Sequence, residues 1–209
     1  MVLSASNVRE RFGIQRMQPS HPAMRRLRRL GHVPGIHGNK HWPAADLLLD
    51  FLLEHPLPKR SRVLDIGCGW GLAGIFCASE FKARVRGVDA DPAVFPYLQA
   101  HAELNGVTVE PLRATYDKLD SRLLSEVDVI LGSDICFWDE MVGPLRRLVK
   151  RGMAAGVKRV IIADPRRSPF LALADHCTDK YRANLVDWQS ETFPELDGAV
   201  LQVKNAGVR

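Results

Sequence analysis

Glycines surround a carboxylate in the run VLDIGCGWGLAGIFCA, and both residue types bear on ligand binding. Glycine allows a tight turn and lets backbone N–H groups approach a ligand closely. The spacing G-x-G-x-x-G at Gly69, Gly71 and Gly74 matches the fingerprint of nicotinamide dinucleotide sites. The same run also contains D-x-G-x-G-x-G, which begins at Asp65 and continues through Gly67, and this pattern suits a different ligand.

The carboxylate of Asp65 helps to decide which of these two ligand types the loop would bind. A carboxylate is unfavourable beside a pyrophosphate and favourable beside a ligand with positive charge, such as an ammonium or a sulfonium. A simpler role is to cap the turn that follows. A dehydrogenase is disfavoured by this carboxylate and by the position of the glycines. In a dinucleotide loop the first glycine usually closes the strand, and Gly67 holds that position here.

A second carboxylate, Asp89, ends the next apolar segment in GVDADP. Its position suits hydrogen bonds to both hydroxyls of an adenosine ribose, whichever cofactor carries the adenosine. Asp91 is the better candidate for a helix cap, because Asp91-Pro92 is a typical helix start. These residues predict that an adenosine-containing ligand binds between the glycine loop and Asp89.

Both motifs follow apolar segments in a chain where strand and helix patterns alternate. This alternation predicts an α/β fold, with a Rossmann-like, doubly wound and mostly parallel sheet of seven strands and a C-terminal antiparallel hairpin. Ligands of such sheets bind beyond the carboxyl ends of the strands. The strands are expected at 62–66, 84–88, 108–111, 127–132, 159–163, 184–192 and 199–204. The helices are expected at 72–80, 93–104, 139–151 and 169–176, preceded by one in PAADLLLDFLLEH.

Positive charge is concentrated near the N-terminus. Residues 1–42 hold eight Lys or Arg and one Glu, whereas the whole chain has a net charge of +5. We expect residues 1–40 to form a basic arm and residues 41–209 to form one domain. A short helix is predicted in HPAMRRLRRLGH, with Met24, Leu27 and Leu30 on one side. The arm favours an acidic partner, either protein or nucleic acid, and the alternative is a solvated tail.

The remaining composition excludes several classes of protein. No apolar run approaches the ~20 residues of a membrane span, and the N-terminus lacks the apolar core of a signal peptide. The four cysteines lack C-x-x-C spacing, which favours reduced thiols in a cytoplasmic protein. The oligomeric state is not predicted. No metal site is expected, and these histidines of the arm are expected to be solvated: His21, His32, His37 and His41.

Three of these segments, VLDIGCGWG, VDADP and DVILGSD, together resemble the class I S-adenosylmethionine-dependent methyltransferases. A narrower similarity links HWPAADLLLDFL, SDICFWDE and VIIADPRRSPF to the seven-β-strand protein-lysine methyltransferases, the group that includes enzymes acting on the electron-transfer-flavoprotein β-subunit. The resemblance implies a methyltransferase with S-adenosylmethionine as its cofactor. Two positions depart from the family pattern: Phe137 replaces the tyrosine of D-x-x-Y, and Arg166 replaces the glycine of D-P-G-R.

The resemblance also implies which residues hold the cofactor. Asp89 would bind the ribose, Tyr116 would be an aromatic wall for the adenine, and Asp117 would accept from the adenine amino group. Trp42 has core packing as an alternative role, and Asp117 could be a surface turn residue. The residues expected at the amino-acid and sulfonium end are Trp42, Asp65, Gly67, Cys68, Gly69, Gly71 and Ser133.

A lysine acceptor makes a particular demand on the site. Its amine has a pKa of ~10.4, so only about one part in a thousand is neutral near pH 7.4. Apolar walls would lower that pKa, and Phe137 and Trp138 are candidates unless they pack in the core. Asp134 would orient the amine. We therefore predict transfer to a protein lysine, with Asp134 and Phe137 as catalytic residues.

Other acceptors and one other class of protein are alternatives. A nucleic-acid amino methyltransferase would normally show an N-P-P-Y-like motif, and SDIC lacks its prolines. A small-molecule methyltransferase stays open. A non-catalytic S-adenosylmethionine-binding module is disfavoured by the intact glycine loop and Asp89.

Overall fold

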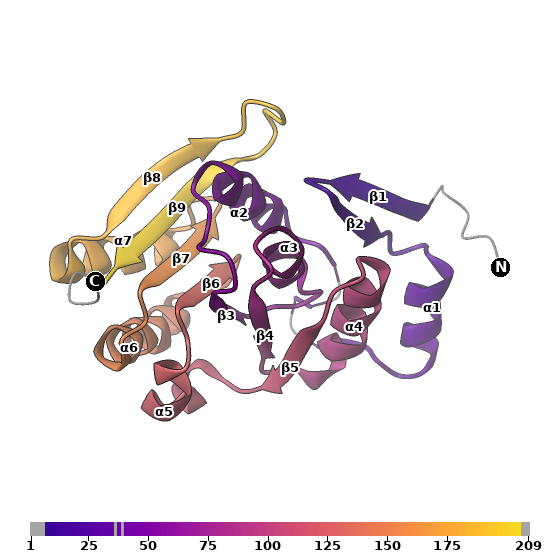
Figure 1. The fold of residues 1–209 in the computed structure, drawn as a ribbon, viewed down its shortest axis with the longest axis horizontal. Coiled ribbons are helices and arrows are strands. Elements are labelled where there is room, and N and C mark those ends of the chain that lie inside the picture. Colours follow the sequence, from indigo (N-terminus) through magenta and orange to yellow (C-terminus); the bar gives the residue numbers. More distant parts are fainter. Residues whose placement is uncertain (1–6, 36, 39, 206–209) are drawn as a thin grey trace.

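The computed structural model describes residues 7–35, 37, 38 and 40–205. A central sheet separates two layers of helices (Figure 1). Its seven strands lie in the order β5-β4-β3-β6-β7-β9-β8. They are β3 (Arg62–Ile66), β4 (Arg84–Asp89), β5 (Val109–Arg113), β6 (Val129–Ser133), β7 (Arg159–Asp164), β8 (Asn184–Gln189) and β9 (Asp197–Lys204).

Five strands of the sheet, β3 to β7, are parallel to one another, and β9 is antiparallel to both of its neighbours, β7 and β8. The predicted fold class, including the C-terminal hairpin, is therefore confirmed. The central strands are buried almost throughout, as expected for strands covered on both faces. The chain starts in β3 and moves outward to β5, then returns to β6 on the other side of β3. This reversal creates the switch point at which ligands bind in such sheets.

Each face of the sheet has its own hydrophobic core. One face is covered by α2 (Pro43–Glu54), α3 (Leu72–Glu80) and α4 (Phe95–Leu104). The other is covered by α5 (Ser121–Ser125), α6 (Asp139–Ala155) and α7 (Ser168–Tyr181). The predicted helix 72–80 has the observed bounds, whereas α6 and α7 extend beyond their predicted ends. The short helix α5 was not predicted, although Asp120 caps it by accepting from the Leu123 N–H at 2.8 Å.

The basic segment begins with a hairpin of β1 (Val8–Arg11) and β2 (Ile14–Met17), followed by α1 (Pro22–Arg29). Sequence analysis did not predict this hairpin. Its two-residue turn, Phe12-Gly13, has positive φ at both positions, a conformation that usually calls for Asn-Gly or Asp-Gly. The helix α1 was predicted, and Met24 is fully buried on it, but Leu30 is 63% exposed, so its expected place on the apolar side was wrong.

The described part of the arm is docked on the domain. The Met17 N–H donates to His101 Nε2 at 3.2 Å, and Gln15 and Asn105 exchange two hydrogen bonds of 2.8 Å. Arg11 lies 3.4 Å from an Asp46 carboxylate oxygen. The division of the chain at residue 40 stays a prediction.

Two of the arm histidines are not solvated, which corrects the sequence expectation. His21 is 4% exposed, and its Nδ1 accepts from the Ala23 N–H at 3.2 Å as the N-cap of α1. The Nε2 atom of His41 lies 3.0 Å from an Asp46 carboxylate oxygen. Both rings therefore have structural partners that the loop-like composition of the segment did not reveal.

Candidate active site

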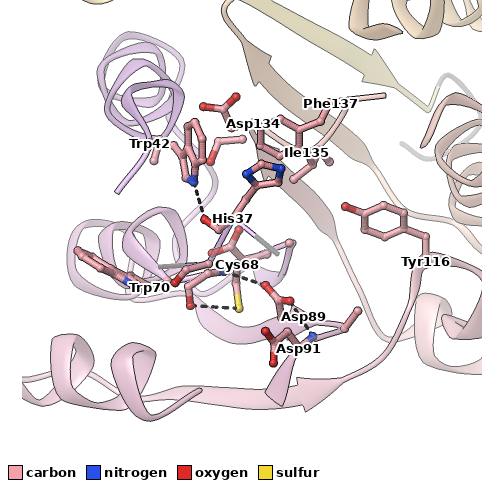
Figure 2. Close-up of a pocket in the computed structure, with 18 of the residues that line it drawn as sticks. His37, Trp42, Cys68, Trp70, Asp89, Asp91, Tyr116, Asp134, Ile135 and Phe137 are labelled. Carbon is pink, nitrogen blue, oxygen red and sulfur yellow. Dashed lines mark hydrogen bonds between the residues drawn. The ribbon is translucent and has the colours of Figure 1, made fainter. Parts of the chain in front are cut away.

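The carboxyl ends of β3, β4 and β6 border a cavity of about 650 Å³ (Figure 2). This volume is typical of pockets that hold small ligands, roughly 300–1,000 Å³. All of the residues predicted to bind cofactor or to act in catalysis line it: Trp42, Asp65, Gly67, Cys68, Gly69, Gly71, Asp89, Tyr116, Asp117, Ser133, Asp134 and Phe137. The structure thus brings together every candidate, and their individual roles remain predictions.

The glycine loop joins β3 to α3 and forms the floor of the cavity. Gly67, Gly69 and Gly71 have φ values of +62°, +51° and +76°, which disfavour other residues. A Cβ atom at Gly67 would lie 2.6 Å from a methyl of Ile135, and one at Gly71 would lie 1.8 Å from a methyl of Leu98. A Cβ at Gly69 meets no atom within 4 Å. Gly67 and Gly71 are thus required by packing, and Gly69 leaves space that a ligand can use.

Asp65 stands at the end of β3, beneath the glycine loop. It is 2% exposed, and its Oδ2 accepts from the Gly74 N–H at 3.0 Å. Burial raises its pKa to about 7. The turn-capping role considered for Asp65 is therefore observed, and contact with a cationic ligand stays a prediction.

Asp89 ends β4 and connects the two predicted motifs. One of its carboxylate oxygens accepts from the Gly69 N–H at 3.1 Å, and the other accepts from the Asp91 N–H at 3.0 Å (Figure 2). Burial raises its pKa, and the two backbone hydrogen bonds oppose that shift. Each oxygen retains a second lone pair for a ribose hydroxyl. Asp91 caps the next helical turn by accepting from the Ala93 N–H at 2.9 Å, as predicted.

The predicted adenine end lies where the chain leaves β5. Tyr116 is half-buried there, and desolvation raises the pKa of its phenol. Both carboxylate oxygens of Asp117 accept from Arg147, at 2.9 and 2.8 Å, and this pairing lowers the pKa of Asp117. Asp117 thus has the character of a surface turn residue, and its predicted bond to an adenine amino group would have to coexist with the Arg147 pair.

Asp134 follows β6 directly, in the left-handed region with φ of +57°. It is 5% exposed, and its Oδ1 forms an ion pair with Arg167. Arg167 also donates to Asp164 at 2.9 Å, and its guanidinium carbon lies 4.6 Å from the centroid of the Phe137 ring. Among the described residues none hydrogen-bonds to Oδ2 of Asp134, so a ligand could donate to this atom.

Aromatic rings gather at the mouth of the cavity (Figure 2). The His37 ring stacks on Phe137 with a centroid distance of 4.5 Å, and it lies 5.5 Å from Trp42 and 5.3 Å from Trp138. Trp138 is 47% exposed. Core packing, the alternative considered for Trp42, Phe137 and Trp138, is therefore not what the structure shows. His37 was expected to be a solvated loop histidine, and it is exposed, but its stacking on Phe137 was not predicted.

One wall of the cavity is formed by Gly35, His37, Gly38 and residues 40–42. The Trp42 indole N–H donates to the His37 carbonyl at 2.7 Å, and the Trp70 indole N–H donates to the Gly38 carbonyl at 3.0 Å. Trp42 itself precedes Pro43, the first residue of α2, which favours the extended backbone that it adopts. Residues on both sides of the predicted division at residue 40 thus contribute to the same wall.

Three of the lining or supporting residues were missed by sequence analysis. His37 and Trp70 form hydrogen bonds that hold the wall just described, and Arg167 reaches the site from the loop after β7. Arg167 lies in the VIIADPRRSPF segment that carries the resemblance, so a signal was present, but its partners are distant in sequence. The glycine motif placed Trp70 in the loop but did not indicate its bond to Gly38, and no sequence pattern around His37 indicated its place.

The cavity fits the cofactor that the resemblance implies. Asp65, Asp89 and Asp91 put three carboxylates on the glycine-loop side, which suits a sulfonium and an ammonium and disfavours a pyrophosphate. The described residues contain no cluster of three or more His, Cys, Asp or Glu side chains that could hold a metal ion. In the same part of the chain, no helix combines the length and the apolar character of a membrane span.

Comparison with known proteins finds similarity to methyltransferases. A methyltransferase-domain family model matches residues 63–152. The electron transfer flavoprotein beta subunit lysine methyltransferase of Xenopus laevis is 30% identical over 131 residues, which are 62% of this chain and 52% of that protein. The ribosomal protein L11 methyltransferase of Dechloromonas aromatica (strain RCB) is 31% identical over 156 residues, 64% of this chain and 53% of that protein. The chain spans about half the length of the curated relatives it matches.

Solved structures agree on the fold. The tRNA (uracil-54, C5)-methyltransferase of Pyrococcus abyssi, in complex with S-adenosyl-L-homocysteine, has a TM-score of 0.52 and 17% identity, and the match covers 95% of this chain and 43% of that one. TrmN from Thermus thermophilus has a TM-score of 0.58 and 20% identity, with 77% and 48% covered. Residues 63–152 thus match a methyltransferase domain, and the fold of the chain is the fold of these solved methyltransferases.

Proposed function

We propose that this protein transfers a methyl group from S-adenosylmethionine to the side-chain amine of a lysine in a protein. The observation that carries the proposal is the Oδ2 of Asp134, which has no hydrogen bond to any residue that the structure describes and lies near Phe137 in the lining of the glycine cavity. Two similar proteins are named as lysine methyltransferases, for the electron transfer flavoprotein beta subunit and for calmodulin. Similar proteins named for ribosomal protein L11 and for ubiquinone biosynthesis make other acceptors the alternatives to test.

S-adenosylmethionine supplies a methyl group on a sulfonium, which is open to attack by a neutral amine. The residues proposed to hold it are the glycine loop with Asp65 and Cys68, Asp89 at the ribose, and Tyr116 with Asp117 at the adenine. Trp42 and Ser133 would line the sulfonium end. Alignment of the acceptor and exclusion of water are then the main tasks of the protein.

Arg167 prepares Asp134 for this role. Its guanidinium binds Oδ1 of Asp134 and also Asp164, so the Asp134 side chain is fixed and its charge is balanced. The remaining oxygen can accept a hydrogen bond from the incoming amine and direct the lone pair of the amine into the cavity. Carboxylates in general are far weaker bases than amines, so we expect the proton of the lysine ammonium to pass to water before transfer.

The aromatic rings at the cavity mouth favour the neutral amine. Desolvation beside Phe137, Trp138 and His37 disfavours a charged ammonium and so lowers its pKa. Deprotonation of an unperturbed lysine near neutral pH costs about 4 kcal/mol, and the apolar walls would reduce that cost. Phe137 acts here through its ring face, which a tyrosine would also provide.

The test uses labelled S-adenosylmethionine and a cell extract. The protein is incubated with both, and the product is treated separately with protease and with nuclease. We expect protease alone to release the label, and mass spectrometry to place the methyl group on a lysine side chain. A labelled nucleobase or small metabolite would contradict the proposal.

We also propose a cytoplasmic location. All four cysteines are buried and free, which suits a compartment that keeps thiols reduced. Fractionation of the source cells, followed by detection of the protein with an antibody, would check this.

A further inference from the structure

The helix α1 presents a concentrated positive charge. Arg25, Arg26, Arg28 and Arg29 are all exposed on it. Among the described residues, Arg25, Arg26 and Arg29 have no ion pair and no side-chain hydrogen bond, whereas Arg28 donates to the Pro19 carbonyl. The sequence has no Asp or Glu between positions 10 and 46. This charge is therefore not balanced within its own segment.

Exposed apolar side chains adjoin these arginines. Leu30, at the end of α1, is 63% exposed, and Val33 is 64% exposed. No other large hydrophobic side chain in the described part of the chain is as exposed as these two. Burying such side chains against a partner would be favourable. We call Arg25, Arg26, Arg29, Leu30 and Val33 the α1 surface.

The α1 surface has a fixed place beside the cavity. Met24 is fully buried in a cluster with Met17, Trp70 and Tyr97, and this cluster holds α1 against α4 (Figure 1). The Tyr97 hydroxyl donates to the His32 carbonyl at 2.5 Å. Two residues after Val33, the chain enters the cavity wall at Gly35, where the Gly35 N–H donates to Asp91 at 2.7 Å. A partner bound to the α1 surface would therefore lie next to the site.

The chemistry of the α1 surface favours a protein partner over a nucleic acid. Single-stranded nucleic acids are usually held by aromatic side chains that stack on the bases, together with basic residues. The sequence from position 13 to position 41 contains no Phe, Tyr or Trp. Aliphatic side chains beside unpaired arginines instead match a segment that carries carboxylates and aliphatic residues.

We infer that the α1 surface docks an acidic, amphipathic segment of the protein substrate, close to the lysine that receives the methyl group. The inference rests on the proposed function for the identity of the acceptor. The arginines attract the segment and set its orientation, and Leu30 and Val33 contribute contact that salt does not screen.

The test measures the binding of labelled synthetic peptides by fluorescence anisotropy. One peptide has a central lysine flanked by alternating glutamate and leucine, and a second has glutamine in place of every glutamate. A single-stranded RNA oligonucleotide is the third probe. We expect the glutamate peptide to bind at least about tenfold more tightly than the glutamine peptide at low salt, and to lose this advantage as salt is raised.

Charge reversal on α1 provides the decisive comparison. The triple variant Arg25→Glu, Arg26→Glu, Arg29→Glu should lose about tenfold or more in affinity for the glutamate peptide. The matched control reverses three exposed cations on other helices, Arg122→Glu, Lys150→Glu and Lys180→Glu, and should bind as the unchanged protein does. In a second variant, Leu30→Ser with Val33→Ser, the remaining affinity at high salt should fall.

Binding of S-adenosylmethionine, measured by calorimetry, should be unchanged in all of these variants and so verifies their fold. Equal binding of both peptides, equal loss in the control, or tighter binding of the RNA would overturn the inference. Methyl transfer to the peptide lysine is followed separately by mass spectrometry. Peptide binding that depends on α1 without methyl transfer would count against the proposed function alone, and methyl transfer that is indifferent to α1 would count against the docking surface alone.

Discussion

The two halves of the cavity are built in different ways. The glycine-loop half is made by neighbouring segments, since Asp65 bonds to the Gly74 N–H and Asp89 bonds to the Gly69 N–H. The acceptor half is made by side chains from distant segments, such as the His37 ring on Phe137 and Arg167 on Asp134. The first half depends mainly on backbone conformation, and the second depends on how separate elements are packed together.

This difference leads to distinct expectations for mutations. Changes in the glycine-loop half should abolish cofactor binding, because the backbone itself forms the contact surface. Changes in the acceptor half should leave cofactor binding nearly intact and reduce turnover. A result in which both halves respond alike would remove the distinction.

The largest effect is expected from Gly69→Val. A β-branched side chain is strained at the φ of +51°, and it would occupy the open space of the cavity floor. Calorimetry should show binding of S-adenosylmethionine and S-adenosylhomocysteine to the unchanged protein, no binding of NAD, and no detectable S-adenosylmethionine binding to the variant.

The control for this prediction is Gly106→Val. Gly106 has a similar φ of +64° and also has no atom within 4 Å of an added Cβ, but it lies in the turn after α4, outside the cavity. This variant should carry comparable backbone strain and still bind S-adenosylmethionine. Tight NAD binding by the unchanged protein, without a response to S-adenosylmethionine, would contradict the assignment of the cavity.

Asp134→Asn tests the acceptor half. The amide keeps the size of the side chain but loses the charge that Arg167 balances and the strong acceptor oxygen proposed for the amine. We expect turnover to fall by about 100-fold or more, while the affinity for S-adenosylmethionine changes only a few-fold. Steady-state kinetics and calorimetry on the same preparation would separate these effects. Asp179→Asn, at an exposed position on α7, is the matched control, and full activity of Asp134→Asn would refute the role.

Sequence patterns predicted the glycine-loop half well because its contacts are local. The helix 72–80, the strand 62–66 and the cap at Asp91 all follow from neighbouring residues, and the structure has them. The outward turn to β5 and the return to β6 agree with the predicted doubly wound fold, although the strand order itself was not predicted.

The acceptor half could be predicted only in part. Asp134 and Phe137 were found through a resemblance, whereas His37 and Arg167 were not assigned roles because their partners lie far away in the sequence. The β1–β2 hairpin was missed for a different reason, since Phe12-Gly13 is an uncommon pair for a turn with two positive φ values. Tertiary contacts with α4 stabilise a turn that the local sequence does not indicate.

His101 provides a test of how the arm is attached to the glycine-loop half. It is fully buried and stacks on Trp70, and its Nε2 accepts from the Met17 N–H, so the neutral ring is required. Burial lowers its pKa from 6.5 to about 4. The unfolded chain therefore binds a proton at His101 more readily than the folded chain does. The contribution of the neutral ring to the free energy of unfolding is fully present above pH 6.5. It is lost as the pH falls toward 4, by about 3 kcal/mol in total.

Urea unfolding at several pH values would measure this loss. The variant His101→Gln should lose the pH dependence of the free energy of unfolding that His101 causes between about pH 6.5 and pH 4. The difference between the stability curves of the variant and the unchanged protein then gives the contribution of His101. His176→Gln, on α7, serves as the control and should keep the pH dependence of the unchanged protein. Parallel curves for His101→Gln and the unchanged protein would show that the ring does not couple the arm to α4 in this way.

The smallest effect is expected from Phe137→Tyr. The ring would keep its stacking on His37 and its position beneath the Arg167 guanidinium, and the added hydroxyl restores the tyrosine of the D-x-x-Y motif that SDICFWDE resembles. Since the acceptor half acts through the ring face and through Asp134, we expect turnover within about threefold of the unchanged protein, whereas Phe137→Ala should lose tenfold or more because the wall is removed. Kinetics with a lysine substrate identified by mass spectrometry would decide. A large loss in Phe137→Tyr would mean that the acceptor must fit closely against the ring edge, and the acceptor half would then select its substrate by shape and not only by desolvation and hydrogen bonding.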